Sequence, residues 1–338
     1  MTVRAGDNPL EIVSRDGRDR PEARPRRAPA KTLEAVVKGL RHSREVTHNI
    51  RQNGGVRELP SPDILARIIN QLAVVLFPTH YGRPELLDEA EIDGLVRRTL
   101  DEALVLLTEQ VRRDLAFSSE NTVSDRANAI VQRFAAQLPA IRGTLVEDLR
   151  AAYRGDPAAT SLPEILLGYP GITAMIHYRL ARALYLLGAG LSARLIGHIS
   201  HSKTAIDIHP GAAIGRSFFI DHGTGVVIGE TAIIGDNVRI YQAVTLGARS
   251  FPADDNGSLV KGVPRHPVIE DDVVIYAGAT ILGRITIGKG SVIGGNVWLT
   301  QSVPAGSSIN QARTQDDLAA DTCLAHQAQF DDGVAQKQ

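Results

Sequence analysis

Residues 269–299 read IEDDVVIYAGATILGRITIGKGSVIGGNVWL, and a large aliphatic residue returns at every sixth position of this stretch. The positions are Ile269, Ile275, Ile281, Ile287, Ile293 and Leu299. An α-helix repeats every 3.6 residues and a β-strand every two, so neither produces a long period of six. A β-solenoid does, because each hexad forms one short side of a coil and its aliphatic side chain stacks on that of the next coil.

The same spacing extends upstream in two shorter runs. Ile208, Ile214 and Ile220 form one run, and the other consists of Ile228, Ile234, Ile240 and Leu246. Glycine often follows the aliphatic residue, and the residue four positions after it is small or aliphatic, as expected where a triangular coil turns a corner. We predict an α + β chain in which a left-handed parallel β-helix of hexapeptide repeats occupies residues 201–310.

The repeat is broken twice. From Ile220 to Ile228 the spacing is eight residues, so two extra residues fall within DHGTG at 221–225. From Leu246 to Ile269 the spacing is 23 residues, which places a loop at 247–268. Insertions in a solenoid leave it as loops, and such loops often carry function. Both breaks contain polar side chains, and we expect the chemistry to lie there.

The rest of the chain follows a different pattern. Residues 31–200 show apolar residues at helical spacing, with Ser61-Pro62 as a cap and first-turn pair and Pro139 separating two helices. We predict a helical domain there. The segment 1–30 is rich in arginine and proline without periodicity, so we expect it to be disordered, and residues 311–338 form a polar tail.

The composition of the chain argues against several classes of function. The chain has 338 residues and a formal net charge of −1, which gives no electrostatic basis for binding nucleic acid or a membrane surface. Cys323 is the only cysteine, so an internal disulfide and a thiolate metal cluster are both excluded. No apolar run approaches the roughly 20 residues that span a bilayer. We expect a soluble cytoplasmic protein.

The first break offers a histidine and a carboxylate partner. Asp207 precedes His222 by 15 residues, and one coil takes about 18, so the two lie on adjacent coils. An aspartate that holds one imidazole nitrogen leaves the other free to accept a proton from a hydroxyl. Asp207 in DIHPG equally suits a turn-capping residue, and a histidine in a Gly-rich turn is more often structural.

The second break offers groups for binding an anion. Arg265 and His266 precede Pro267 at the loop exit, and a guanidinium fork suits a carboxylate, although a solvated surface loop is the alternative. Gly247 and Ala248 open the loop, where small residues let backbone N–H groups approach a ligand. Zinc held by His209, His222 and His266 is a further alternative that their spacing does not exclude. No two of these histidines share one coil at ligand spacing, however, and each neighbours Asp, Arg or Pro, so we predict no metal.

The residues of the β-helix also resemble a known family. Two segments resemble the core of the serine O-acetyltransferases: IDIHPGAAIGRSFFIDHGTGVVIGETAIIGDNVRIYQAVTLG and RHPVIEDDVVIYAGATILGRITIGKGSVIGGNVWL. Upstream, RGDPAATSLPEILLGYPGITAMIHYRLARALY resembles the last helices before their β-helix. The resemblance covers about residues 150–303. Residues 1–150 resemble only loosely the long helical N-domain of one branch.

The resemblance implies a reaction and a set of site residues. The family transfers acetyl from acetyl-CoA to the hydroxyl of L-serine, without a metal, to give the O-acetylserine used in cysteine synthesis. By motif, His222 is the general base and Asp207 orients it. Asp156 and Asp221 are implied to bind the serine amino group. Arg265 and His266 are implied to bind its carboxylate. The implied acetyl-CoA site includes Gly247, Ala248, Ala277 and Gly278.

The resemblance also implies an assembly. The family forms trimers with active sites between neighbouring β-helices, and the helical domains often pair two trimers. Its complex with O-acetylserine sulfhydrylase uses a C-terminal isoleucine, whereas residue 338 is glutamine, which argues against that partner here.

The chain departs from the family near the acetyl-CoA site. Tyr276 stands where a glycine is usual, the loop at 247–268 is longer, and SVPAGSSINQARTQDD replaces a motif that helps to hold CoA. The alternatives are therefore a hexapeptide acetyltransferase for another small acceptor, a zinc enzyme of the carbonic anhydrase type, and an inactive trimeric scaffold.

Overall fold

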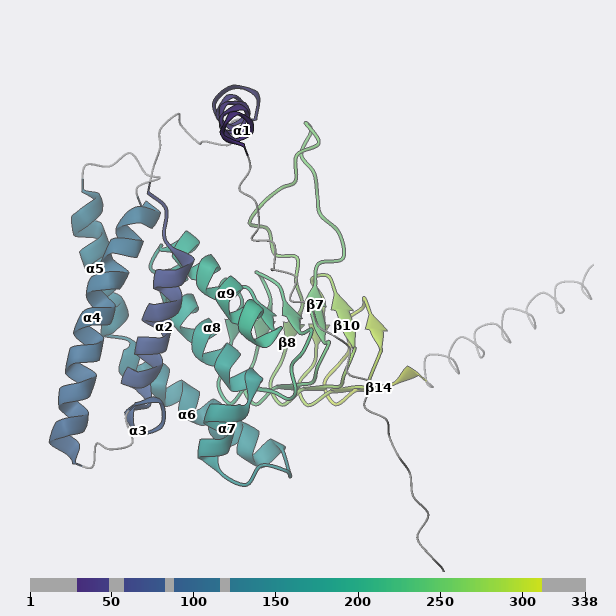
Figure 1. Ribbon diagram of the computed structural model, residues 1–338. Helices are drawn as coiled ribbons and strands as arrows, with labels where there is room; N and C mark the ends of the chain where they lie inside the picture. Colours follow the sequence, from purple (N-terminus) through teal and green to yellow (C-terminus); the bar gives the residue numbers. More distant parts are fainter. Residues whose placement is uncertain (1–28, 49–57, 83–87, 116–121, 312–338) are drawn as a thin grey trace, which may run out of the picture. The chain divides into compact units, whose positions relative to one another are not determined.

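The computed structural model describes residues 29–48, 58–82, 88–115 and 122–311 (Figure 1). The predictions made for residues 1–28 and 312–338, including those on Cys323 and Gln338, lie outside these ranges. The chain divides into two compact units, one ending at Val56 and one beginning at Arg57.

The first unit contains the helix that the sequence predicts from Lys31. It is α1 (Ala30–His42), continued by a π-helical turn η1 (Ser43–Thr47). Leu33, Val36, Val37 and Leu40 are spaced along one stripe of α1, and each is more than half exposed.

The second unit begins with a helical region. Its helices are α2 (Pro62–Leu76), α3 (Pro78–Tyr81), α4 (Glu89–Leu115), α5 (Val123–Ala135), α6 (Leu138–Gly155), α7 (Leu162–Gly168), α8 (Pro170–Leu186) and α9 (Gly190–Thr204). The predicted cap is present, because the Ser61 side chain accepts a hydrogen bond from the Ile64 N–H at 3.4 Å. Pro139 lies in the first turn of α6, where a missing N–H costs nothing.

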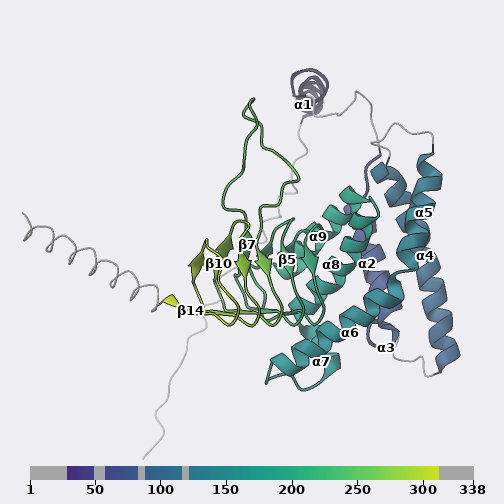
Figure 2. The same ribbon diagram turned by 180° about the vertical axis from the view of Figure 1, so that it is seen from behind.

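After α9 the chain winds into a solenoid of short parallel strands. The first coil is formed by β1 (Asp207–Ile208), β2 (Ala213–Ile214) and β3 (Phe219–Ile220). The later strands are β4 (Val227–Ile228), β5 (Ile233–Ile234), β6 (Arg239–Ile240), β7 (Thr245–Gly247), β8 (Val268–Ile269), β9 (Val274–Ile275), β10 (Thr280–Leu282), β11 (Thr286–Ile287), β12 (Val292–Ile293), β13 (Trp298–Leu299) and β14 (Ser308–Ile309). Figure 2 shows the coils stacked from the helical region toward β14.

The strands form three parallel sheets, which are the faces of a triangular prism. Their orders are β1-β4-β7-β10-β13, β11-β8-β5-β2 and β14-β12-β9-β6-β3, and we call them sheets A, B and C. The repeated aliphatics pair in register across coils, as in Ile208 with Ile228 and Ile281 with Leu299. The hexapeptide-repeat left-handed β-helix predicted from the period of six is therefore confirmed.

The two breaks in the repeat are accommodated differently in the solenoid. The pair Ile208 and Ile228 is 20 residues apart, compared with 18 for Ile281 and Leu299, so the first break is absorbed within one turn of the coil. The second break projects from the prism between β7 and β8 as a long loop, visible in both views (Figures 1 and 2). This loop narrows to an antiparallel bridge between Ala253 and Leu259.

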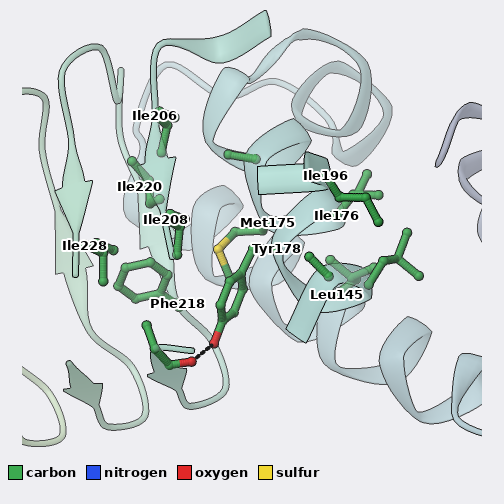
Figure 3. Close-up of a cluster of buried hydrophobic side chains, with 14 of the residues drawn as sticks. Leu145, Met175, Ile176, Tyr178, Ile196, Ile206, Ile208, Phe218, Ile220 and Ile228 are labelled. Carbon is green, nitrogen blue, oxygen red and sulfur yellow. Dashed lines mark hydrogen bonds between the residues drawn. The ribbon is translucent and has the colours of Figure 1, made fainter. Parts of the chain in front are cut away.

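The helical region and the β-helix share one core. Helices α6 and α8 contact β3, and α9 contacts β1, so the predicted boundary near residue 200 is a change of secondary structure within one unit. Met175 and Tyr178 of α8 pack toward Ile208 and Phe218, and the Tyr178 hydroxyl donates to the Ala212 carbonyl at 2.7 Å (Figure 3). Burying this apolar surface joins the solenoid to the helices.

A buried ion pair fixes the entry into β3. Arg179 of α8 donates to both carboxylate oxygens of Asp148 in α6, at 2.6 and 2.8 Å. Arg179 also donates to the Gly215 carbonyl, and Asp148 accepts the Phe218 N–H at 3.0 Å. Because both partners also bind the β-helix backbone, the first coil is held against two helices directly before the first break.

Candidate functional site

Most of the predicted site residues lie at two different corners of the prism, apart from Asp156 at the end of α6 and Asp207 in β1. Asp221–Gly225 joins β3 of sheet C to β4 of sheet A, and we call it the His222 corner. Arg265 and His266 lead into β8 of sheet B, beside Gly229–Thr231 and His209, which join sheets A and B. We call this second group the Arg265 corner.

The His222 corner is a tight left-handed turn. His222 has a φ of 57° and Gly223 of 85°, and the Gly223 N–H donates to the Asp221 carbonyl at 2.6 Å. A Cβ on Gly223 would lie 2.4 Å from Cδ1 of Ile206, so only glycine fits there. This turn takes up the two extra residues and leaves the His222 side chain 70% exposed.

The carboxylate nearest to this imidazole is not the predicted one. Among the described residues, the only carboxylate within 4.0 Å of His222 is that of Asp221, at 3.9 Å from Nδ1. Asp207 begins β1 and is exposed, and no hydrogen bond or ion pair in the described ranges joins it to His222. Its orienting role stays a prediction.

Asp156 lies beside the His222 corner. It caps the C-terminus of α6, and its carboxylate accepts hydrogen bonds from the Tyr169 hydroxyl at 2.5 Å and the Ala158 N–H at 2.8 Å. The Tyr169 hydrogen bond is the main cause that lowers the pKa of Asp156, and the charge of His222 lowers it further. The same hydrogen bond raises the pKa of Tyr169 to about 12, with a smaller effect from Asp221.

These electrostatic effects place four polar side chains in one neighbourhood. Asp156, Tyr169, Asp221 and His222 come from α6, the start of α8 and the first break. Two carboxylates and a tyrosine there can bind an ammonium group beside an imidazole. Tyr169 was not among the sequence candidates; its only sequence signal is its place directly before Pro170, between two helices.

The Arg265 corner is half-buried and densely hydrogen-bonded. Arg265 donates from Nη2 to Oε2 of Glu230 at 2.7 Å, and His266 is 6% exposed. Burial lowers the pKa of His266, as do the charges of Arg265 and Arg284. His209 accepts the Gly211 N–H on Nδ1 at 2.8 Å, and burial lowers its pKa to about 4. Both imidazoles are therefore neutral near pH 7.

The residues predicted for acetyl-CoA are divided between the corners. Gly247 ends β7 and opens the long loop with Ala248 on the side of the Arg265 corner. Ala277 and Gly278 join β9 of sheet C to β10 of sheet A, in line with the His222 corner. Beside them, the ring of Tyr276 stacks on that of Tyr241 with centroids 5.0 Å apart.

Two further observations concern metals and membranes. In the described ranges, no group of three or more His, Cys, Asp or Glu side chains is arranged to hold a metal ion. Within the same ranges, no helix combines the length and the apolar character needed to cross a membrane.

Comparison with known proteins gives a consistent result. Residues 266–301 match the family model described as "Bacterial transferase hexapeptide (six repeats)". The "Serine acetyltransferase, plasmid" of Synechococcus elongatus is 59% identical over 268 residues, which cover 77% of this chain and 84% of that protein.

Solved structures agree in fold and sequence. Native serine acetyltransferase 1 of Entamoeba histolytica aligns with a TM-score of 0.63 at 35% identity and covers 83% of this chain and 97% of its own. The same enzyme in complex with L-cysteine aligns with a TM-score of 0.62 at 35% identity, covering 82% of this chain and 99% of its own.

Proposed function

The chain belongs to the serine acetyltransferase family, and we propose that it acetylates L-serine from acetyl-CoA with His222 as the general base. The observation that carries this proposal is the gathering of Asp156, Tyr169 and Asp221 around an exposed imidazole at the first break. An imidazole titrates near neutral pH and can take a proton from a hydroxyl as that hydroxyl attacks.

The reaction balances without another reactant. As the serine oxygen attacks the thioester carbonyl, its proton passes to a ring nitrogen of His222. The tetrahedral intermediate then expels the CoA thiolate by breaking the C–S bond, and the thiolate receives the proton from His222. The products are O-acetylserine and CoA, and the base is restored.

The substrate's two charges match the two corners. The ammonium group of serine suits the carboxylates of Asp156 and Asp221, and its carboxylate suits Arg265 and His266. The L-cysteine complex of the Entamoeba relative supports a site that binds an amino acid of about the size of serine. The residues proposed to bind acetyl-CoA are small, so backbone N–H groups there can approach a ligand. They are Gly247, Ala248, Ala277 and Gly278.

The separation of the corners supports an assembly in which neighbouring chains complete each site. One chain carries the ammonium-binding group between sheets C and A and the carboxylate-binding group between sheets A and B. In a threefold ring, the His222 corner of one chain meets the Arg265 corner of the next. A homotrimer follows, and contacts between helical regions then allow a dimer of trimers.

A thiol-release assay tests the reaction. The wild-type protein should release CoA from acetyl-CoA only when L-serine is present, and His222→Ala should lower kcat by about a thousandfold or more. The variant should keep the sedimentation coefficient of the wild type. Near-normal turnover by His222→Ala, or release with other small hydroxyl acceptors but not with L-serine, would contradict the proposal.

Mixing two inactive variants tests the shared site. His222→Ala and Arg265→Ala chains, unfolded together and refolded at equal ratio, should regain about a quarter of wild-type activity, since one interface in four then pairs two intact corners. Each variant refolded alone is the control. A mixture no more active than the controls would place the whole site within one chain.

A further inference from the structure

Two tyrosine rings stack on the coils beyond the His222 corner. Tyr241 directly follows β6 and Tyr276 directly follows β9, and their ring centroids are 5.0 Å apart with the planes 9° from parallel. We infer that the face of Tyr276 turned away from Tyr241 binds the pantetheine arm of the acyl donor. The identity of this ligand rests on the function proposed above, whereas the arrangement of the rings does not.

The two tyrosines belong to a column of residues that lie one coil apart. The strands before them pair in register, as Ile220 does with Ile240 and Ile275 with Ile293. The residue that follows each strand therefore lies beside its counterpart on the next coil. In order from the helical region, the column consists of Asp221, Tyr241, Tyr276 and Gly294.

The spacing of the rings shows which way their faces are turned. Neighbouring strands lie about 4.8 Å apart, close to the 5.0 Å between the two ring centroids. The rings therefore lie one above the other along the column, with one face of Tyr276 on Tyr241 and the other turned toward Gly294. Glycine contributes no side chain to cover that second face, and Tyr276 is 44% exposed.

The residues next to the uncovered face are small. Ala277 follows Tyr276, and Gly295 follows Gly294 on the next coil. Gly295 is exposed, and a Cβ there would have the Ala277 carbonyl oxygen, at 3.2 Å, as its one contact among the described residues. The ring thus stands beside exposed backbone, where a flexible chain can lie against its face.

Distance along the β-helix determines which part of the donor reaches the ring. Gly294 is three coils from Asp221, or about 14 Å. The pantetheine arm, comparable in length to about five extended residues, spans roughly 16 Å from the sulfur to the pyrophosphate. With the thioester held at His222, the outer half of the arm reaches Tyr276, and the adenine lies beyond it. Its geminal methyl groups and planar amide gain contact area on an aromatic face.

This contact gives a role to a residue that departs from the family pattern. Tyr276 stands where a glycine is usual, directly before Ala277 and Gly278 of the proposed acetyl-CoA site. A glycine would offer the arm only backbone, whereas the ring adds an apolar surface. Because the stack on Tyr241 already holds the ring, little side-chain freedom is lost when a ligand packs against it.

Truncated donors test the inference at saturating L-serine. Acetyl-CoA and S-acetylpantetheine carry the whole arm, whereas S-acetyl-N-acetylcysteamine lacks its outer half. Tyr276→Ala should raise the KM for the first two donors about tenfold, the effect of losing roughly 50 Å² of buried apolar contact. The KM for the third donor should stay within about twofold. Tyr276→Phe should keep the wild-type values for all three, because the ring face makes the contact.

Calorimetry gives a readout that does not depend on turnover. CoA should bind Tyr276→Ala about tenfold more weakly than it binds the wild type or Tyr276→Phe. Adenosine 3′,5′-bisphosphate, which lacks the arm, should bind all three proteins equally. Tyr153→Ala is the matched control, since Tyr153 is similarly exposed, at 47%, but lies on α6 outside the column, and this variant should bind CoA as the wild type does.

The outcomes separate this inference from the proposed function. CoA binding that depends on Tyr276, without acetylation of L-serine, would defeat the function and support the ring contact. Acetylation of serine with an unchanged donor KM and CoA affinity in Tyr276→Ala would defeat the ring contact alone.

Three further results would also overturn the ring contact. A loss for acetyl-CoA but not for S-acetylpantetheine would place the adenine on the ring. An equal loss for S-acetyl-N-acetylcysteamine would show a general structural effect. A smaller sedimentation coefficient for Tyr276→Ala with unchanged CoA affinity would assign the ring to a contact between chains.

Discussion

The two corners of the β-helix hold their histidines in opposite ways. His222 lies on a left-handed turn with its side chain 70% exposed and one carboxylate 3.9 Å away. His266 is 6% exposed, has its Nδ1 bonded by Thr231, and has a pKa lowered by burial. The exposed histidine is the proposed general base, whereas burial keeps His266 neutral near pH 7.

Under the proposed function, one repeated architecture serves two chemical roles. The first break inserts two residues and makes a turn that exposes its histidine, while the second inserts a long loop whose return is bonded to the preceding coil. A proton acceptor has to move between two charge states, but a group that recognises a carboxylate works best in one fixed state.

The largest contrast is expected from replacing each histidine by glutamine. His222→Gln should lower kcat by about a thousandfold, because an amide cannot accept the hydroxyl proton. His266→Gln should raise the KM for L-serine about tenfold and leave kcat within a few-fold, because only a binding contact is lost. Steady-state kinetics with both substrates varied measures this split. Equal losses of kcat in the two variants would mean that the corners do not differ in role.

A methyl group on Gly229 should have the next largest effect. Gly229→Ala pushes the His266 ring from its place, and a displacement of about 1 Å can lower kcat/KM for serine by up to about a hundredfold. Gly143→Ala in α6 is the control, since a Cβ there meets nothing within 4 Å. A crystal structure of Gly229→Ala with the ring unmoved, or unchanged kinetics, would contradict this prediction.

Neutralising Glu230 should have a smaller effect. Glu230→Gln weakens the bond that orients Arg265, and we expect the serine KM to rise about three- to tenfold with kcat retained. The matched control is Glu147→Gln, which alters the exposed pair of Glu147 with Arg216. If Glu230→Gln instead lowers the serine KM, Glu230 competes with the substrate for Arg265 and does not position it.

The smallest effect concerns stability in acid. The pKa of His209 is lowered to about 4 and that of His266 is also lowered, whereas an unfolded histidine titrates near 6.5. Below about pH 6.5 the unfolded chain therefore binds protons that the folded chain does not, so stability falls as the pH drops toward 4. Calorimetry should show Tm decreasing over this window, with a shallower slope for His209→Gln. An equal slope in that variant would show that other groups cause the loss.

Much of the fold could be predicted from the sequence because the hexapeptide repeat is local. Each aliphatic position in the period of six pairs with its counterpart in the next coil, as Leu246 does with Ile281 across the long loop. The helical nature of the region before the β-helix was also predicted, including the Ser61 cap. The shared core of α6, α8 and the first coil was not predicted. It depends on contacts between distant segments, such as that of Tyr178 with Ala212.

The site was predictable only in part. The breaks in the repeat identified His222 and the pair Arg265 and His266, because polar residues stand out where an aliphatic period stops. Tyr169, Glu230 and Thr231 were not among the sequence candidates, because only the fold brings them to Asp156, Arg265 and His266, which lie 13 to 35 positions away. Glu230 and Thr231 in particular follow Ile228-Gly229, where the sequence shows nothing but the repeat resuming.

The sequence by itself thus determined the β-helix and the places where it is interrupted, since a side-chain period is a local property that each coil repeats. Only the tertiary structure decided which interrupted segments share a corner, which carboxylate lies near His222, and which residue contacts the His266 ring. The physical reason is distance along the chain: the Thr231 contact with His266 joins residues 35 positions apart, and the long loop between β7 and β8 lies between them. Such contacts exist only where neighbouring coils are stacked.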